Sequence, residues 1–118
     1  MFTPKDFVDI AEKLIKEKGF PNDAKTRTIL NRAYYGAFLI TKTRLEELGE
    51  SFSNEKEIHM AVIKKLKEKD DNLGDKLNSL YDDRMASDYN LNDEPEANIH
   101  TNVGIARFLV SKMPKFVP

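Results

Sequence analysis

Cysteine and tryptophan are both absent from this sequence of 118 residues, and glycine and proline occur only five times each. Without cysteine, the chain cannot form a disulfide, a zinc–thiolate centre or a thiol nucleophile. Phosphate-cradling glycine loops and Gly-rich linkers between domains are missing as well. No apolar run approaches the ~18 residues of a membrane span, and the N-terminus shows no secretory pattern. These absences lead us to expect a single soluble domain, residues 1–118, in the cytoplasm.

An excess of charge of either sign is also lacking. Lysine and arginine total 19 against 20 aspartates and glutamates, which gives a net charge of −1. Proteins dedicated to duplex nucleic acids usually carry a basic excess, so any RNA or DNA contact here must come from a local patch. Charged residues make up 33% of the chain and hydrophobic residues 40%, a composition that favours a helical globular protein over a disordered one.

Apolar residues recur with helical spacing along the chain. The apolar residues of 22–48 cover more than one face, which predicts a long central helix with neighbours on several sides. No segment alternates with period two for long enough to be a strand, and short connections favour antiparallel neighbours. We therefore expect an all-α, up-and-down bundle of four or five helices. Their expected ranges are about 4–18, 22–48, 53–69, 73–89 and 95–113, with Pro114 ending the last.

The most unusual part of the central helix is "ILNRAYYGAFLI", residues 29–40, where polar side chains interrupt an apolar pattern. Arg32 and Tyr35 are three residues apart and therefore share one face of the helix. Gly36 destabilises a helix by roughly 0.5–1 kcal/mol relative to alanine, which suggests that another helix or a ligand approaches closely there. The alternative is a structural polar network that joins two helices, and these residues alone favour that alternative.

A second polar stretch, "LYDDRMASDYNL", covers residues 80–91. Arg84 and Asp88 stand at positions i and i+4, so they pair if the helix continues to Tyr89. An acidic residue at a helix C-terminus needs a compensating cation, and Arg84 or Arg32 could supply it. Because a guanidinium binds carboxylate and phosphate with the same forked geometry, the pattern fits a phosphate site. It equally fits an exposed ion pair without a function.

Two histidines are present, and neither indicates catalysis by itself. His59 lies beside the inward-facing residues of the third predicted helix, and His100 lies in the first turn of the last one. A single histidine on a helix face more often packs or caps than reacts. The two also lack the short spacing of metal ligands, so we expect no metal and no cofactor.

Together, "RTILNRAYYGAFLITKTRLEELG" and "LYDDRMASDYNL" resemble the two motifs of the HEPN domain family. The spine helix of that family typically reads Ser/Asn-Arg-Ala-Tyr-Tyr-Ala/Gly-Ala-Phe, and a later helix ends in Arg-x-x-Ala/Ser-Asp-Tyr. The resemblance covers about residues 5–112, and His59 stands where many members carry histidine. It implies a helical bundle that usually forms a homodimer. Members bind nucleotides, cleave RNA without a metal, or act with a small nucleotidyltransferase in toxin–antitoxin or defence systems.

Ribonucleases of this family use Arg-x(4–6)-His, and the corresponding residues 89–91 of this chain contain no histidine. We therefore predict a module that binds nucleotide or RNA phosphate, or a nucleotidyltransferase-like partner. Two alternatives stay open. One is a metal-independent ribonuclease that uses Arg84 with a different acid or base, and the other is a structural dimerisation protein with a buried Arg32–Asp88 bridge. The predicted site residues are Arg32, Tyr35, Arg84, Asp88 and Tyr89, with His59 as a secondary candidate.

Overall fold

Helix α2 (Asn22–Glu47) forms the centre of the molecule, because it contacts every other helix. Its buried residues include Ile29, Tyr34 and Phe38 and lie on several sides of the helix, as the long apolar stretch predicted. The remaining helices are α1 (Pro4–Lys16), α3 (Ile58–Lys69), α4 (Asp71–Tyr89) and α5 (Ile99–Lys112), and a short 3-10 helix, η1 (Met113–Lys115), follows α5.

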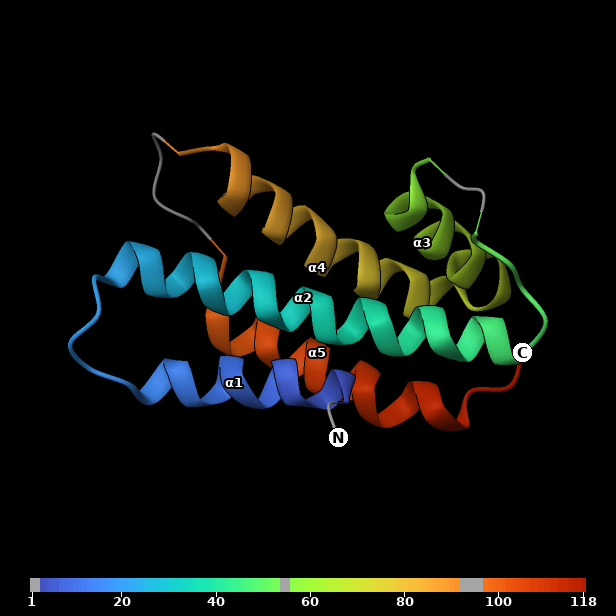
Figure 1. Ribbon diagram of the computed structural model, residues 1–118, viewed down its shortest axis with the longest axis horizontal. Helices are drawn as coiled ribbons and strands as arrows, with labels where there is room; N and C mark the ends of the chain where they lie inside the picture. The colour runs from blue at the N-terminus through green and yellow to red at the C-terminus, as the bar shows by residue number, and fades with distance from the viewer. Residues whose placement is uncertain (1–2, 54–55, 92–96) are drawn as a thin grey trace.

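The computed structural model describes residues 3–53, 56–91 and 97–118, and every regular element within these ranges is a helix. In Figure 1, helices α1, α2, α4 and α5 alternate in direction, while the short α3 lies against α4 near the C-terminal half of α2. The all-α bundle that the sequence predicted is therefore confirmed. No helix in the described ranges is long and apolar enough to cross a membrane.

Polar side chains fix the starts of two helices. Asp70 accepts a hydrogen bond from the Leu73 N–H at 3.0 Å at the start of α4. Asn98 accepts one from the Thr101 N–H, also at 3.0 Å, at the start of α5. These bonds satisfy backbone donors that the first turn of a helix leaves unpaired. Because a single residue separates α3 from α4, the two helices are forced into close contact.

Helix α1 ends two residues earlier than the expected Lys18. Glu17 leaves the helix with an extended backbone, and its carbonyl accepts a hydrogen bond from Lys25 Nζ at 2.9 Å. At the other end of the chain, α5 ends at Lys112 and Pro114 lies in η1, so the predicted stop at this proline is confirmed. The end of α1 thus lies at a contact with α2 that the local sequence does not reveal.

Helix α3 begins at Ile58 and not at the predicted residue 53. Phe52 is buried outside any helix, and Ser53 lies in a turn with its hydroxyl 3.4 Å from that of Ser51. The Phe52 ring is thus packed into the core just before this turn, and the predicted helix start at residue 53 was wrong. Pro95, the predicted start of the last helix, falls outside the described ranges.

Gly36 lies where α2 crosses α1. A Cβ atom at this position would come within 2.6 Å of Val8 Cγ2 and 2.8 Å of the Pro4 carbonyl oxygen. The close approach predicted from this glycine is therefore confirmed. The helix that approaches is α1, and not α4, which carries Arg84.

Candidate functional site between helices α2 and α4

A chain of hydrogen bonds joins α2 to α4 at the two polar stretches. Arg84 Nε donates to Asp88 Oδ2 at 3.0 Å, and Asn31 Nδ2 reaches the same oxygen at 3.5 Å. Arg32 Nε in turn donates to Asn31 Oδ1 at 2.9 Å. The predicted pairing of Arg84 with Asp88 is confirmed. The predicted direct bridge from Arg32 to Asp88 is wrong, because Asn31 stands between them and Arg32 forms no ion pair within the described ranges.

The Arg84 side chain is nearly buried, with 14% of its surface exposed. Its guanidinium carbon lies 4.9 Å from the centre of the Tyr35 ring and 5.7 Å from that of Tyr34, so the structure brings the predicted site residues Tyr35 and Arg84 together. Nε is bonded to Asp88, whereas neither Nη atom donates to a residue of the described ranges. Four of the five N–H donors of a guanidinium belong to these two nitrogens. The outer edge of Arg84 is therefore open to an acceptor from outside the chain.

Tyr35 lies close to a second arginine. The guanidinium carbon of Arg32 is 5.6 Å from the Tyr35 ring centre and 4.8 Å from that of Phe7, which comes from α1. Contacts of this kind contribute about 0.5–1 kcal/mol each, and more when they are shielded from water. They hold Arg32 against an aromatic surface instead of leaving it free in solvent. The sequence analysis did not single out Phe7, because nothing in its spacing distinguishes it from a core residue.

His59 enters the same aromatic cluster from α3. Its Nδ1 lies 2.7 Å from the Tyr34 hydroxyl, and its ring centre lies 4.4 Å from that of Phe38 and 6.0 Å from that of Tyr35. Burial lowers the pKa of His59 below its ordinary value, and the charge of Arg84 lowers this pKa further. Burial also raises the pKa of the Tyr34 phenol. Both groups are therefore neutral near pH 7, and the secondary candidate His59 is brought within electrostatic reach of Arg84.

A pocket of about 300 Å³ opens beside the chain of hydrogen bonds. This volume is at the lower end of the range for small-molecule sites. All of its lining residues are polar or charged, and two arginines stand against one aspartate, so the pocket suits a small anionic group. The residues that line it are Arg27, Thr28, Asn31, Arg32 and Asp88.

Arg27 is a site residue that the sequence analysis missed. It donates hydrogen bonds to the carbonyl oxygens of Ser87 and Asn90 at the C-terminal end of α4. Those carbonyls carry the partial negative charge of a helix end, which a cation stabilises. The sequence analysis had looked for such a cation only at Arg84 and Arg32. Arg27 lies one helical turn before Asn31, and that i, i+4 spacing could have placed it on the same face.

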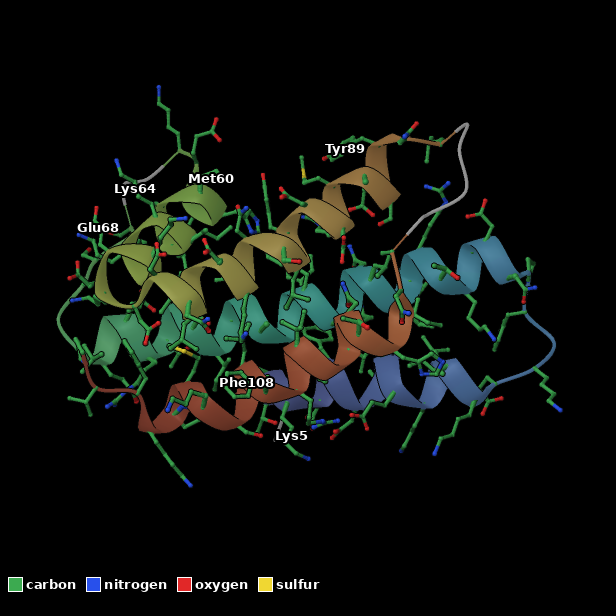
Figure 2. All side chains as sticks on the ribbon, turned by 180° about the vertical axis from the view of Figure 1, so that it is seen from behind. Lys5, Met60, Lys64, Glu68, Tyr89 and Phe108 are labelled. Carbon is green, nitrogen blue, oxygen red and sulfur yellow. The ribbon has the colours of Figure 1, made fainter. Side chains whose placement is uncertain are left out.

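Two of the residues considered from the sequence lie outside this cluster. Tyr89 is the last residue of α4 and is 72% exposed, and its side chain makes no hydrogen bond or ring contact to the described part of the chain. Figure 2 shows it at the end of α4, on the outside of the bundle. His100 is also exposed, in the first turn of α5. Within the described ranges, no group of three or more histidine, cysteine, aspartate or glutamate residues could hold a metal ion.

Comparison with known proteins finds similarity to an uncharacterized protein of Methanocaldococcus jannaschii. The two chains are 35% identical over 108 residues, an alignment that covers 77% of this chain and 65% of the relative. The chain therefore spans less than two thirds of the length of this relative, whose name states no activity. No protein-family model matches the chain, and no solved structure matches it significantly.

Proposed function

We propose that this chain is a HEPN-like binding module whose site holds a phosphate group of a nucleotide or of RNA. The observation that carries the proposal is the outer edge of Arg84. The side chain is 14% exposed, its Nε is fixed by Asp88, and its two Nη atoms donate to no residue of the described ranges. These donors have no acceptor within the described ranges and are not buried, so they can bind an acceptor from outside, and an oxyanion supplies two oxygens in the geometry that a guanidinium prefers.

The surroundings of Arg84 support an anionic ligand with an attached ring or sugar. Arg32 adds a second positive charge on the other side of the hydrogen-bond chain, and Arg27 lines the adjacent pocket. Tyr35 presents an aromatic surface next to both Arg32 and Arg84. A chain with a net charge of −1 thus has a local positive patch, which is the form of nucleic-acid contact that its composition allows.

The resemblance to the HEPN family also leads us to propose an oligomeric state, a partner protein and a cellular role. We expect a homodimer that acts with a nucleotidyltransferase-like protein in a toxin–antitoxin or defence system, in the cytoplasm. The motifs of α2 and α4 support this expectation. Light scattering after size exclusion tests the dimer, which should have twice the 13.6 kDa mass of the chain. A nucleotidyltransferase encoded beside this protein, and copurifying with it, would support the partner.

The binding claim is tested by comparing Arg84→Ala with Arg107→Ala. Arg107 pairs with Asp9 and Glu12 across α1 and α5, so its loss removes the same charge from a different face. Charge-assisted hydrogen bonds contribute about 1.5–3 kcal/mol each, and we therefore expect Arg84→Ala to weaken binding roughly 10- to 100-fold. Calorimetric titration with AMP, ATP and a short single-stranded RNA measures the change. Unchanged affinity in a folded Arg84→Ala protein would show that Arg84 does not bind the phosphate.

A metal-independent ribonuclease is the second candidate, and the position of His59 favours it. This histidine comes from α3, yet it is close enough for the Arg84 charge to shift its pKa. Histidine is the side chain best suited to general acid–base catalysis near neutral pH. If the candidate is right, RNA is cleaved in EDTA and cleavage is lost in both Arg84→Ala and His59→Ala. Intact RNA after incubation across a range of sequences and pH values would eliminate it.

A further inference from the structure

The hydroxyl of Tyr34 decides which nitrogen of His59 carries the proton. Tyr34 is fully buried, and its hydroxyl has one hydrogen-bond partner within the described ranges, His59 Nδ1 at 2.7 Å. A buried O–H group needs an acceptor. If Nδ1 carried the proton and donated it to the oxygen, the phenol proton would have no acceptor among these residues. Nδ1 is therefore the acceptor, and a neutral His59 carries its proton on Nε2.

The Nε2–H group of His59 is available to a ligand. No residue of the described ranges bonds to Nε2, and it is not one of their buried polar atoms without a partner, which are Thr41 Oγ1 and Asn102 Oδ1. His59 and Arg84 both adjoin the Tyr35 ring, with its centre 6.0 Å from the imidazole centre and 4.9 Å from the guanidinium carbon. His59 and Arg84 are thus both neighbours of the Tyr35 ring.

We infer that His59 is a binding residue whose Nε2–H donates to the same oxyanion as Arg84, and that Tyr34 is a positioning residue that keeps His59 in this tautomer. The inference rests on the proposed phosphate site and adds to it an uncharged hydrogen-bond donor, the Nε2–H group of His59. The assigned tautomer also favours phosphate binding over the ribonuclease candidate. With Nδ1 occupied by Tyr34 and Nε2 protonated, His59 has no free lone pair to take a proton from a ribose hydroxyl. The resting site therefore holds a phosphate and does not activate a nucleophile.

The groups that surround His59 keep it neutral. Tyr34, Tyr35 and Phe38 face the ring from α2, and Tyr81 stacks on it from α4 with 6.0 Å between ring centres. Arg84, also from α4, is the charged group that acts on it, while Asp88 is engaged by Arg84. Burial and a neighbouring cation both disfavour the imidazolium form.

Tyr34→Phe is the variant that tests the inference, because it removes the hydroxyl and keeps the ring. The substitution leaves Nδ1 without a hydrogen bond, so His59 becomes a mixture of its two neutral tautomers. The pKa of His59 rises, because a hydrogen bond that stabilised the neutral form is lost. The probe is a short RNA with a 5′-hydroxyl end, whose phosphodiester charges stay constant in this pH range. For the unmodified protein we expect constant affinity from pH 8 down to about 6.5, the ordinary pKa of histidine. Tyr34→Phe should bind several-fold more weakly at pH 8 and regain affinity on acidification at a higher pH than the unmodified protein does.

Nitrogen-15 NMR of the imidazole gives a readout that a structural role would not change. We expect a pyrrole-like Nε2 and a pyridine-like Nδ1 for His59 in the unmodified protein, and averaged signals in Tyr34→Phe. His59→Gln keeps an N–H donor near the Nε2 position and should retain more affinity than His59→Leu. The exposed His100 provides the control His100→Gln, which should leave affinity unchanged.

The outcomes distinguish this inference from the proposed function. A proton on Nδ1 in the unmodified protein overturns the assigned tautomer. RNA binding that is lost in Arg84→Ala but unchanged in Tyr34→Phe and His59→Leu overturns the role of His59 and leaves the phosphate site standing. Absence of RNA and nucleotide binding by the unmodified protein overturns both the site and its neutral donor, whatever tautomer NMR reports.

Discussion

At the scale of single residues, the site depends on how each polar side chain divides its hydrogen-bonding groups between protein and ligand. Arg84 Nε donates a hydrogen bond to Asp88, and the two Nη atoms have no acceptor among the described residues. Nδ1 of His59 accepts the hydrogen bond of the Tyr34 hydroxyl, and its Nε2–H stays available to a ligand. In both residues the inner atom is fixed by a neighbour, so the outer donors are oriented before a ligand arrives. Such preorganisation reduces the entropy lost on binding.

The neutral His59 also makes stability depend on pH. The folded state holds the pKa of His59 below its ordinary value of about 6.5, so the unfolded chain binds the proton first as the pH falls. The contribution to stability is present above this pKa and is lost on acidification. Between pH 7 and 5, the unmodified protein should therefore lose more stability than His59→Gln, as measured by urea unfolding followed by circular dichroism. Equal losses in both proteins would contradict this explanation, and His100→Gln should behave like the unmodified protein.

At the scale of helices, two glycines in different environments provide a matched pair. Gly36 has Val8 and the Pro4 carbonyl against it, whereas a Cβ on Gly104 of α5 would meet nothing within 4 Å. Gly36→Ala should destabilise the fold by roughly 1–3 kcal/mol, because α1 has to move away from α2. Gly104→Ala should stabilise it by up to about 1 kcal/mol through helix propensity alone. Thermal unfolding of the two variants measures both effects, and a Gly36→Ala protein as stable as Gly104→Ala would refute the close crossing.

The helices also show which features the sequence could predict and which it could not. Spacing within one helix is fixed by helix geometry, so the Arg84–Asp88 pair and the long α2 were predictable. Contacts between helices are not encoded in spacing. The approach of His59 to Arg84 and the closure of the α4 end by Arg27 appear only once the helices are packed. The end of α1 and the start of α3 were also predicted wrongly, and both lie beside tertiary contacts, of Lys25 and Phe52, that spacing does not encode.

At the scale of the whole molecule, a net charge of −1 limits how strongly this protein can attract RNA over a distance. If Arg32 and Arg84 supply the two phosphate contacts, the logarithm of affinity should fall with the logarithm of salt concentration with a slope of about −1.4 for a single strand. Fluorescence anisotropy of a labelled RNA between 50 and 300 mM salt, about a sixfold range, measures this slope. A slope several times steeper would mean that RNA binds to a broad basic surface with many phosphate contacts and not to this site.

The central claim is that a phosphate occupies the outer edge of Arg84, and NMR of the arginine side chains during titration with AMP tests it most directly. A bidentate phosphate slows rotation of a guanidinium, so the Nη signals of Arg84 should shift and separate, while those of Arg107, held by Asp9 and Glu12, should not change. If AMP binds and the Arg84 signals stay where they are in the free protein, the phosphate lies elsewhere and the claim is wrong.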